Sequence, residues 1–210
     1  MSRVVVIGGG IAGLASAALL AREGHKVTLL EGRPEVGGRA GSWEQDGFRF
    51  DTGPSWYLMP EVFDHFYKLL GTSADEQLKL VTLDPGYRVY FEGVAEPLDV
   101  SAELEDNLEM FEAIEPGAGD RLEKYLDSAR ETYELAKLRF LYTTFADIRT
   151  LLRRDVLSKT GKFLRLLLEP LSSLVGRKFR DQRLRQVLGY PAVFLGSSPY
   201  LTPSMYHLMS

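Results

Sequence analysis

The apolar positions at the start of the chain predict a strand, a helix and a second strand. Residues 4–7 (VVVI) form a short β-branched run that stops at a glycine, which is typical of a buried parallel strand. Residues 11–23 are rich in Ala and Leu and are followed by Gly24, a pattern that indicates a helix with a glycine C-cap. Residues 27–30 (VTLL) form the next strand, so the segment is expected to fold as a right-handed βαβ unit with a parallel sheet.

After this unit the sequence predicts both strands and helices up to residue 100, and mainly helices after it. Residues 48–51 (FRFD) alternate as a short strand does, and residues 60–70 have the pattern of a helix. Residues 79–100 carry turn signals between β-rich pieces, which indicates antiparallel strands. We therefore expect an α/β part with a β-rich segment over residues 1–100, followed by a mainly helical part over residues 101–210.

The composition excludes several kinds of site. The chain of 210 residues has no cysteine, so disulfides, thiolate metal sites and cysteine nucleophiles are excluded, and a cytoplasmic location is expected. The histidines are scattered, no G-x-S-x-G motif occurs, and no apolar run reaches the roughly 18 residues that a membrane-spanning helix needs. We predict neither a metal centre nor a hydrolytic site.

The strongest motif lies between the first strand and the helix and matches G-x-G-x-x-G. Its residues are Gly8, Gly9, Gly10, Ile11, Ala12 and Gly13. Gly8 permits a tight turn, Gly10 lets the backbone approach a pyrophosphate, and Gly13 lets the helix pack closely on the strand. The helix begins between the last two glycines, where its N–H groups favour phosphate, and Glu31 after the second strand can accept a ribose hydroxyl. This context predicts dinucleotide binding; the alternative is that the glycines only form turns.

A second glycine pair follows this unit, in the stretch EGRPEVGGRAGS over residues 31–42. A minimal dinucleotide-binding unit does not contain it. Gly38 would bring further backbone close to the ligand, and Arg39 is a permanent cation that can fork onto phosphate oxygens. Two contacts on one pyrophosphate suit a tightly held, extended dinucleotide. For Arg39 the alternative is a surface salt bridge.

These runs, VVVIGGGIAGLASAALL…VTLLEGRPEVGGRAGSW…GFRFDTGPS, resemble the flavin amine oxidase and phytoene desaturase superfamily, and most of all its bacterial carotenoid desaturases. The similarity covers essentially the whole chain. It implies FAD as the cofactor, a Rossmann-type FAD-binding βαβ domain within residues 1–100, and a partly helical substrate- and membrane-binding domain over residues 101–210. Family members are longer and carry a second FAD-binding segment, so we expect this sequence to be an N-terminal fragment without the C-terminal part.

The resemblance also implies roles for individual residues. Glu31 would hold the adenosine ribose of FAD, and Arg33 would lie near the adenosine. Gly38 and Arg39 would contact the diphosphate and the ribityl chain. The segment Thr52-Gly53-Pro54 would pass close to the isoalloxazine ring.

The activity that the resemblance implies is desaturation of a phytoene-type C40 carotenoid precursor, by hydride transfer to the flavin and loss of a proton. Alternatives are another superfamily enzyme, such as an amine or protoporphyrinogen oxidase or a carotenoid isomerase or oxygenase, or a non-redox prenyl-binding protein of the same fold. Asp51 could orient backbone beside the flavin site, although a turn role explains it as well, and Asp147 could be an acid/base group near the substrate, although a helix N-terminal role is commoner. No catalytic residue is assigned.

Residues 149–185 are leucine-rich and carry eleven Lys and Arg against three acidic residues. Basic amphipathic helices are typical of peripheral membrane binding, and a long isoprenoid substrate would come from lipid. The alternative is a set of core helices with a solvated basic face. No nucleic-acid-binding pattern is present, so nucleic acid is not expected as a partner, and the sequence leaves the oligomeric state open.

Overall fold

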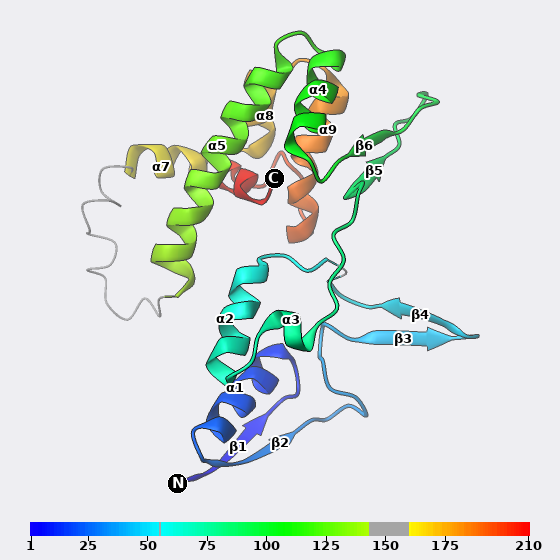
Figure 1. Ribbon diagram of the computed structural model, residues 1–210. Helices are drawn as coiled ribbons and strands as arrows, with labels where there is room; N and C mark the ends of the chain where they lie inside the picture. Colours follow the sequence, from blue (N-terminus) through cyan, green and yellow to red (C-terminus); the bar gives the residue numbers. More distant parts are fainter. Residues whose placement is uncertain (55, 143–159) are drawn as a thin grey trace. The chain divides into compact units, whose positions relative to one another are not determined.

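The computed structural model describes residues 1–54, 56–142 and 160–210, which divide into two compact units, Met1–Val81 and Thr82–Ser210 (Figure 1). The sequence places the division later, after residue 100. The difference is the hairpin of β5 (Tyr87–Val89) and β6 (Leu98–Val100), which belongs to the second unit because Leu98 is buried in its helical core. The functional roles assigned to the two parts remain predictions.

The first unit begins with the predicted βαβ arrangement. Strand β1 (Arg3–Ile7) leads into helix α1 (Ile11–Arg22), and strand β2 (Lys26–Leu30) returns parallel to β1. The register pairs Arg3 with Lys26 at one end and Ile7 with Leu30 at the other. The carboxyl ends of both strands therefore meet beside the beginning of α1, where dinucleotide-binding folds hold their ligand.

The prediction of a buried first strand is wrong for one face of this sheet. Val5, Ile7 and Leu30 are exposed, Ile7 to 86%. In the described residues the sheet has two strands and α1 packs on it, so alternate side chains point away from the helix toward solvent. The apolar pattern predicts the strands correctly, but it does not determine how many layers cover them.

An antiparallel hairpin and two helices complete the first unit. Strand β3 (Ser42–Gln45) pairs with β4 (Phe48–Asp51), the strand predicted from FRFD. Helix α2 (Pro60–Leu70) ends at Gly71 in the left-handed conformation, and the short helix α3 (Ala74–Gln77) follows. Asp51 is the last residue of β4, next to the segment that enters the candidate site.

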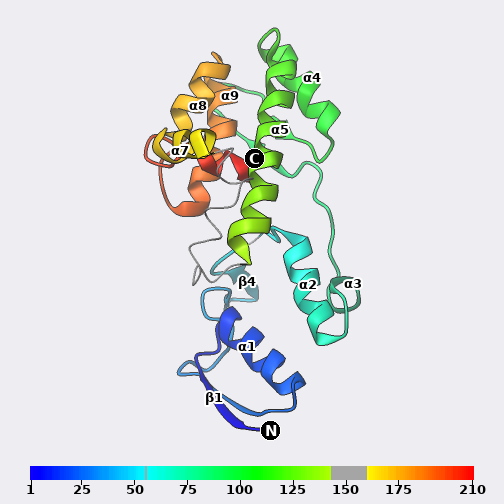
Figure 2. The ribbon, with the colours of Figure 1, turned by 90° about the vertical axis from the view of Figure 1, so that its left-hand side faces the viewer.

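The second unit is mainly helical (Figures 1 and 2). After the hairpin come α4 (Leu104–Ile114), α5 (Ala118–Ala136), the π-helical turn η1 (Lys137–Leu141), α7 (Thr160–Leu168), α8 (Leu171–Lys178), α9 (Gln182–Gly189), and the 3₁₀ segments η3 (Tyr190–Leu195) and η4 (Ser204–Met209). Its core gathers large side chains from several helices, among them Phe111, Tyr125, Leu171, Phe179 and Leu184. The helices are thus held by a shared apolar interior and not by local propensity alone.

The basic segment 149–185 falls partly outside the described residues, since 143–159 are not among them. In α8 and α9 the apolar side chains lie in the core, as Leu171, Val175 and Leu184 show. For these two helices the alternative of core helices is confirmed. Helix α7 differs, because Leu164, Leu167 and Leu168 are exposed. Among the described helices, none has the length and apolarity needed to cross a bilayer.

Candidate functional site

The beginning of α1 presents backbone donors without acceptors. Gly10 is the N-cap and has no side chain to accept a hydrogen bond, and the N–H of Leu14 is the first to bond back, to the Gly10 carbonyl at 2.9 Å. In the described structure the N–H groups of Ile11, Ala12 and Gly13 donate to no protein acceptor. A helix N-terminus with unsatisfied donors and a positive dipole end is suited to bind a phosphate.

Gly13 is required by close packing, as the motif predicts. A Cβ atom at this position would collide with the carbonyl oxygen of Gly8 and would lie 3.6 Å from Val6 Cγ1. Gly8 itself has a φ of 102°, which side chains rarely adopt. The turn and the helix therefore approach each other at a distance that excludes a larger residue.

The second glycine pair packs directly on the first glycine turn. The Gly37 N–H donates to the Gly9 carbonyl at 2.7 Å. Gly38 has a φ of 62°, and a Cβ there would lie 3.1 Å from the Cα of Gly10. The two glycine clusters, distant in the sequence, thus form one backbone surface. The close packing against the first turn explains why glycines occupy the second pair, and the sequence pattern alone did not predict this packing.

A third segment lies against this surface. The Thr52 N–H donates to the Gly41 carbonyl at 3.0 Å. A Cβ on Gly53 would collide with the Arg39 carbonyl oxygen, so only glycine fits there. The segment Thr52-Gly53-Pro54 is thereby held against the loop that carries Arg39.

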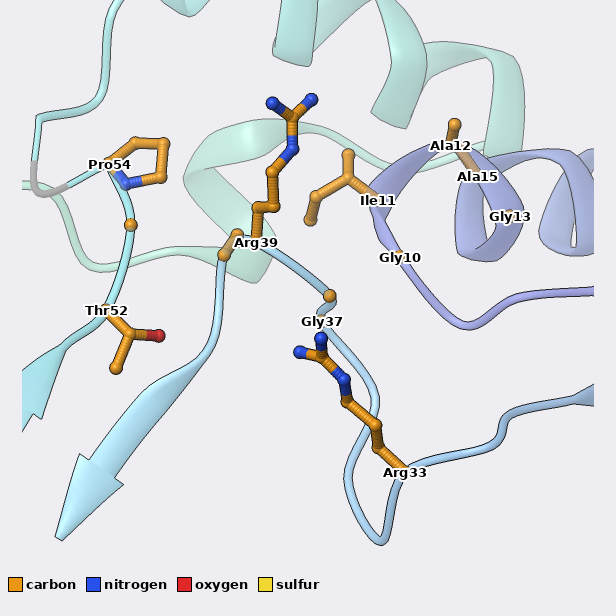
Figure 3. Close-up of a pocket in the computed structure, with 13 residues that line it drawn as sticks. Gly10, Ile11, Ala12, Gly13, Ala15, Arg33, Gly37, Arg39, Thr52 and Pro54 are labelled. Carbon is orange, nitrogen blue, oxygen red and sulfur yellow. The ribbon is translucent and has the colours of Figure 1, made fainter. Parts of the chain in front are cut away.

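These three segments line an open pocket with a volume of about 1030 Å³, large enough for a dinucleotide-sized ligand (Figure 3). Ten residues proposed from the sequence line it: Gly10, Ile11, Ala12, Gly13, Arg33, Gly38, Arg39, Thr52, Gly53 and Pro54. Gly8 and Glu31 do not line it. Ala15, Gly37 and Ala40 do line it, although the sequence analysis did not propose them as site residues. For Gly37, the glycine pair itself was the available signal.

Arg33 and Arg39 supply the positive charge of this pocket. Within the described residues neither guanidinium forms an ion pair, so the salt bridge considered for Arg39 is not found there. Figure 3 shows Arg39 beside Ile11, with Thr52 and Pro54 on the other side of the pocket, and Arg33 on the loop below Gly37. Two unpaired cations next to open helix N–H groups favour a ligand with negatively charged phosphates.

Glu31 holds the glycine turn from outside the pocket. Its Oε2 accepts the Gly9 N–H at 2.6 Å, and its Oε1 accepts the Arg33 N–H at 2.8 Å. The hydrogen bonds from Arg33 and Gly9 lower the pKa of the Glu31 carboxyl, because they favour its charged form. Each oxygen retains acceptor capacity, so the ribose contact implied by the resemblance remains a prediction.

We expect the turn to loosen in acid through Glu31. A carboxyl whose pKa is lowered by folding stabilises the folded state at pH values above its ordinary pKa of 4.5. This stabilisation is lost as the pH falls through the lower pKa of the folded state. A Glu31→Gln variant should therefore bind FAD several-fold more weakly at neutral pH and lose part of the acid sensitivity. Flavin fluorescence titrations at a series of pH values measure both; an unchanged profile in the variant would contradict this role.

Among the described residues, none of the remaining titratable candidates lines the pocket. His207 is buried, with its ring nitrogens near the Ser204 carbonyl at 2.9 Å and Ser128 Oγ at 3.1 Å, so this histidine has a structural role in the second unit. Burial lowers the pKa of His207. Asp147 lies outside the described residues. No cluster that could hold a metal ion occurs in the part of the chain that the structure describes.

Known proteins share this sequence pattern. The family of flavin-containing amine oxidoreductases matches the chain over residues 11–210. The chain belongs to this family. This match confirms the α/β flavin-binding fold and the family resemblance that the sequence indicates. The flavin of this family agrees with the FAD cofactor expected from the sequence.

Curated members of the family with similar sequences are carotenoid desaturases. A carotenoid 3,4-desaturase from Haloarcula japonica is 41% identical over 99% of this chain and 41% of its own length. A zeta-carotene-forming phytoene desaturase from Myxococcus xanthus is 34% identical over 99% of this chain and 40% of its own length. The chain thus spans about two fifths of the length of these relatives.

Solved structures agree in fold. A putrescine oxidase bound to putrescine matches with a TM-score of 0.56 at 17% identity, over 100% of this chain and 41% of that one. An oxidoreductase from Methanosarcina mazei matches with a TM-score of 0.51 at 20% identity, over 98% of this chain and 41% of that one. At such identities the likeness shows the fold alone.

Proposed function

We propose that the protein, as a full-length enzyme, is an FAD-dependent oxidoreductase that desaturates a phytoene-type C40 carotenoid precursor. The observation that carries this proposal is the pocket formed by three glycine-containing segments, with open N–H groups at the start of α1 and two arginines that form no ion pair with the described residues. These groups fit the diphosphate of FAD, because both the helix end and the guanidinium groups favour negative charge.

The bound flavin would supply the acceptor for a hydride taken from a C–H bond of the substrate, while a proton leaves the neighbouring carbon and a double bond forms between them. The residues of this chain bind and orient the cofactor. The open N–H groups of α1 and Arg39 would hold the diphosphate, and the segment Thr52-Gly53-Pro54 would lie on the ring side of the pocket. No residue of the described pocket is assigned as a base.

Sequence similarity favours a carotenoid substrate over the alternatives. The Haloarcula japonica relative named as a carotenoid 3,4-desaturase is 41% identical, whereas the putrescine oxidase is 17% identical. Arg33 and Arg39 argue against a non-redox prenyl-binding protein, because such a protein needs no diphosphate site. An amine or protoporphyrinogen oxidase activity is the enzyme alternative that the substrate assay has to test.

We also propose that the protein is cytoplasmic and binds the membrane surface peripherally, where a hydrocarbon substrate is available. Within residues 149–185, the described part that supports this is α7. Leu164, Leu167 and Leu168 are exposed on a helix that also carries Lys162 and Arg165, which is the pattern of an interfacial helix. The core helices α8 and α9 are left out of this proposal because their apolar residues are buried.

The test uses full-length protein with Arg39→Ala and, as a matched control, Arg49→Ala. Arg49 is exposed on β4 and lies outside the pocket. Since charged hydrogen bonds contribute about 1.5–3 kcal/mol, Arg39→Ala should weaken FAD binding about tenfold to a hundredfold, and Arg49→Ala should leave it unchanged.

Absorption spectra after desalting measure flavin retention, and incubation with phytoene followed by chromatography measures desaturation. Equal FAD affinity in both variants would contradict the assigned role of Arg39. Flavin retention with oxidation of an amine but not of phytoene would reject the carotenoid substrate.

A further inference from the structure

The second unit contains a cavity that the proposed flavin chemistry does not use. Its volume is about 330 Å³, and residues of α5, α7 and α8 line it. Four lining residues are cations: Lys162, Arg165, Arg177 and Lys178. Among the described lining residues, Glu169 is the one carboxylate. The cavity therefore has an excess of positive charge.

Glu169 already has partners. Arg165 donates to its Oε2 through Nε at 3.3 Å, and Arg177 contacts both carboxylate oxygens, through Nη2 to Oε2 at 2.8 Å and through Nη1 to Oε1. The Glu169 side chain is 13% exposed, so this carboxylate is largely enclosed between the two arginines. Arg165 uses Nε alone in these contacts, which leaves the terminal nitrogens of its guanidinium without an acceptor in the described structure.

The two lysines differ in their surroundings. Lys162 pairs with Glu131 at 2.5 Å, whereas Lys178 has no carboxylate within ion-pair distance among the described residues. Burial lowers the pKa of Lys178, and the positive charges of Arg177 and Lys124 lower it further. Cations that crowd a concave site repel each other, and an anion in that site would offset the repulsion.

We infer that this cavity binds a phosphate group. The terminal nitrogens of Arg165 can donate to phosphate oxygens, and Lys178 adds a point charge that no carboxylate of the described residues pairs with, while Arg177 remains on Glu169 and adds positive charge nearby. The phosphate could belong to a phospholipid headgroup or to a free phosphate compound. The exposed leucines of α7 make the headgroup the first source to test. This inference does not depend on the flavin chemistry.

The test compares full-length protein with its Lys178→Gln and Lys178→Arg variants, and with Arg130→Gln as a control. Arg130 is an exposed residue of α5 that pairs with Asp127 at 3.1 Å, outside the cavity, and the control loses the same charge. Lys178→Gln should bind phosphatidylcholine vesicles containing phosphatidylglycerol about fivefold to tenfold more weakly. Lys178→Arg should bind normally, and Arg130→Gln should change by less than about twofold.

Vesicle sedimentation measures binding to the lipid headgroup. Inorganic phosphate tests the free source: we measure its competition with vesicle binding and the rise in melting temperature that it causes. Phosphate stabilisation that needs Lys178, together with vesicle binding that does not, would support the site and assign it to a free phosphate compound. Equal losses in Lys178→Gln and Arg130→Gln would overturn the inference, as would insensitivity of both probes to Lys178.

Circular dichroism melting without ligand checks that the variants fold. Desaturation is measured separately, with substrate dispersed in detergent. Lack of desaturation beside intact phosphate binding would count against the proposed function and not against the cavity.

Discussion

Replacing Gly53 with alanine is expected to abolish tight FAD binding. The new Cβ would collide with the Arg39 carbonyl oxygen and lie 3.4 Å from the Cα of Ala40. Both neighbours are backbone, so relief requires a shift of the loop that carries Arg39. Overpacking of this kind costs about 1–3 kcal/mol, and displacement of Arg39 removes a charged contact with the diphosphate as well. Together these effects predict a loss of FAD affinity of about a hundredfold or more.

Gly32→Ala is the matched control for this variant. Gly32 lies in the loop between β2 and β3 that also carries Arg39, a Cβ there would meet no atom within 4 Å, and its φ is not in the left-handed region. The control should bind FAD as the unmodified protein does. Equilibrium titration with FAD, followed by flavin fluorescence, compares the two variants. Equal affinities would show that the close approach between Gly53 and Arg39 is not needed for the pocket.

Replacing Phe179 with alanine is expected to cost the second unit about 3–5 kcal/mol of unfolding free energy. Phe179 is fully buried, and its ring lies edge-on to Phe111 at a centroid distance of 5.7 Å and to Tyr125 at 6.3 Å. The Arg121 guanidinium lies 5.9 Å from the centre of the same ring. Alanine would leave a cavity among rigid neighbours and remove these ring contacts.

Urea unfolding followed by far-ultraviolet circular dichroism measures this loss, because the second unit supplies most of the described helix. Tyr200→Ala is the control, since Tyr200 is an aromatic residue of the same unit and is 74% exposed. Its unfolding free energy should change by about 0.5 kcal/mol or less. A Phe179 variant that unfolds at the same urea concentration as the control would contradict the core position of this residue.

Local sequence is informative for the first unit's βαβ segment. The βαβ unit and the roles of Gly8 and Gly13 could be predicted from the sequence, because strand and helix periodicity and the sterics of one tight turn depend on neighbours in the chain. The family resemblance implied the remaining segments of the pocket, and ten of the twelve proposed residues line it. Their contacts with FAD are still predictions.

The reasons for several glycines were not accessible from the sequence. Gly38 packs on Gly10, and Gly53 packs on Arg39, although neither pair is close in the chain. Glu31 likewise bonds to Gly9 as well as to the nearby Arg33. These contacts arise when separate loops fold against one another, and no periodic pattern records that approach.

The basic amphipathic helices show most clearly what the sequence determines and what tertiary packing decides. Their sequence determined that each helix has an apolar face and a basic face, because side-chain direction repeats with the helical turn. Only the tertiary structure decided that Leu171 and Leu184 lie in the core while Leu168 is 76% exposed. Removing an apolar helix face from water is favourable whether protein or lipid covers that face. Which of the two covers it therefore depends on the elements that pack beside the helix. The sequence by itself therefore determined the glycine turn and the helix faces, and tertiary packing decided which faces remain open.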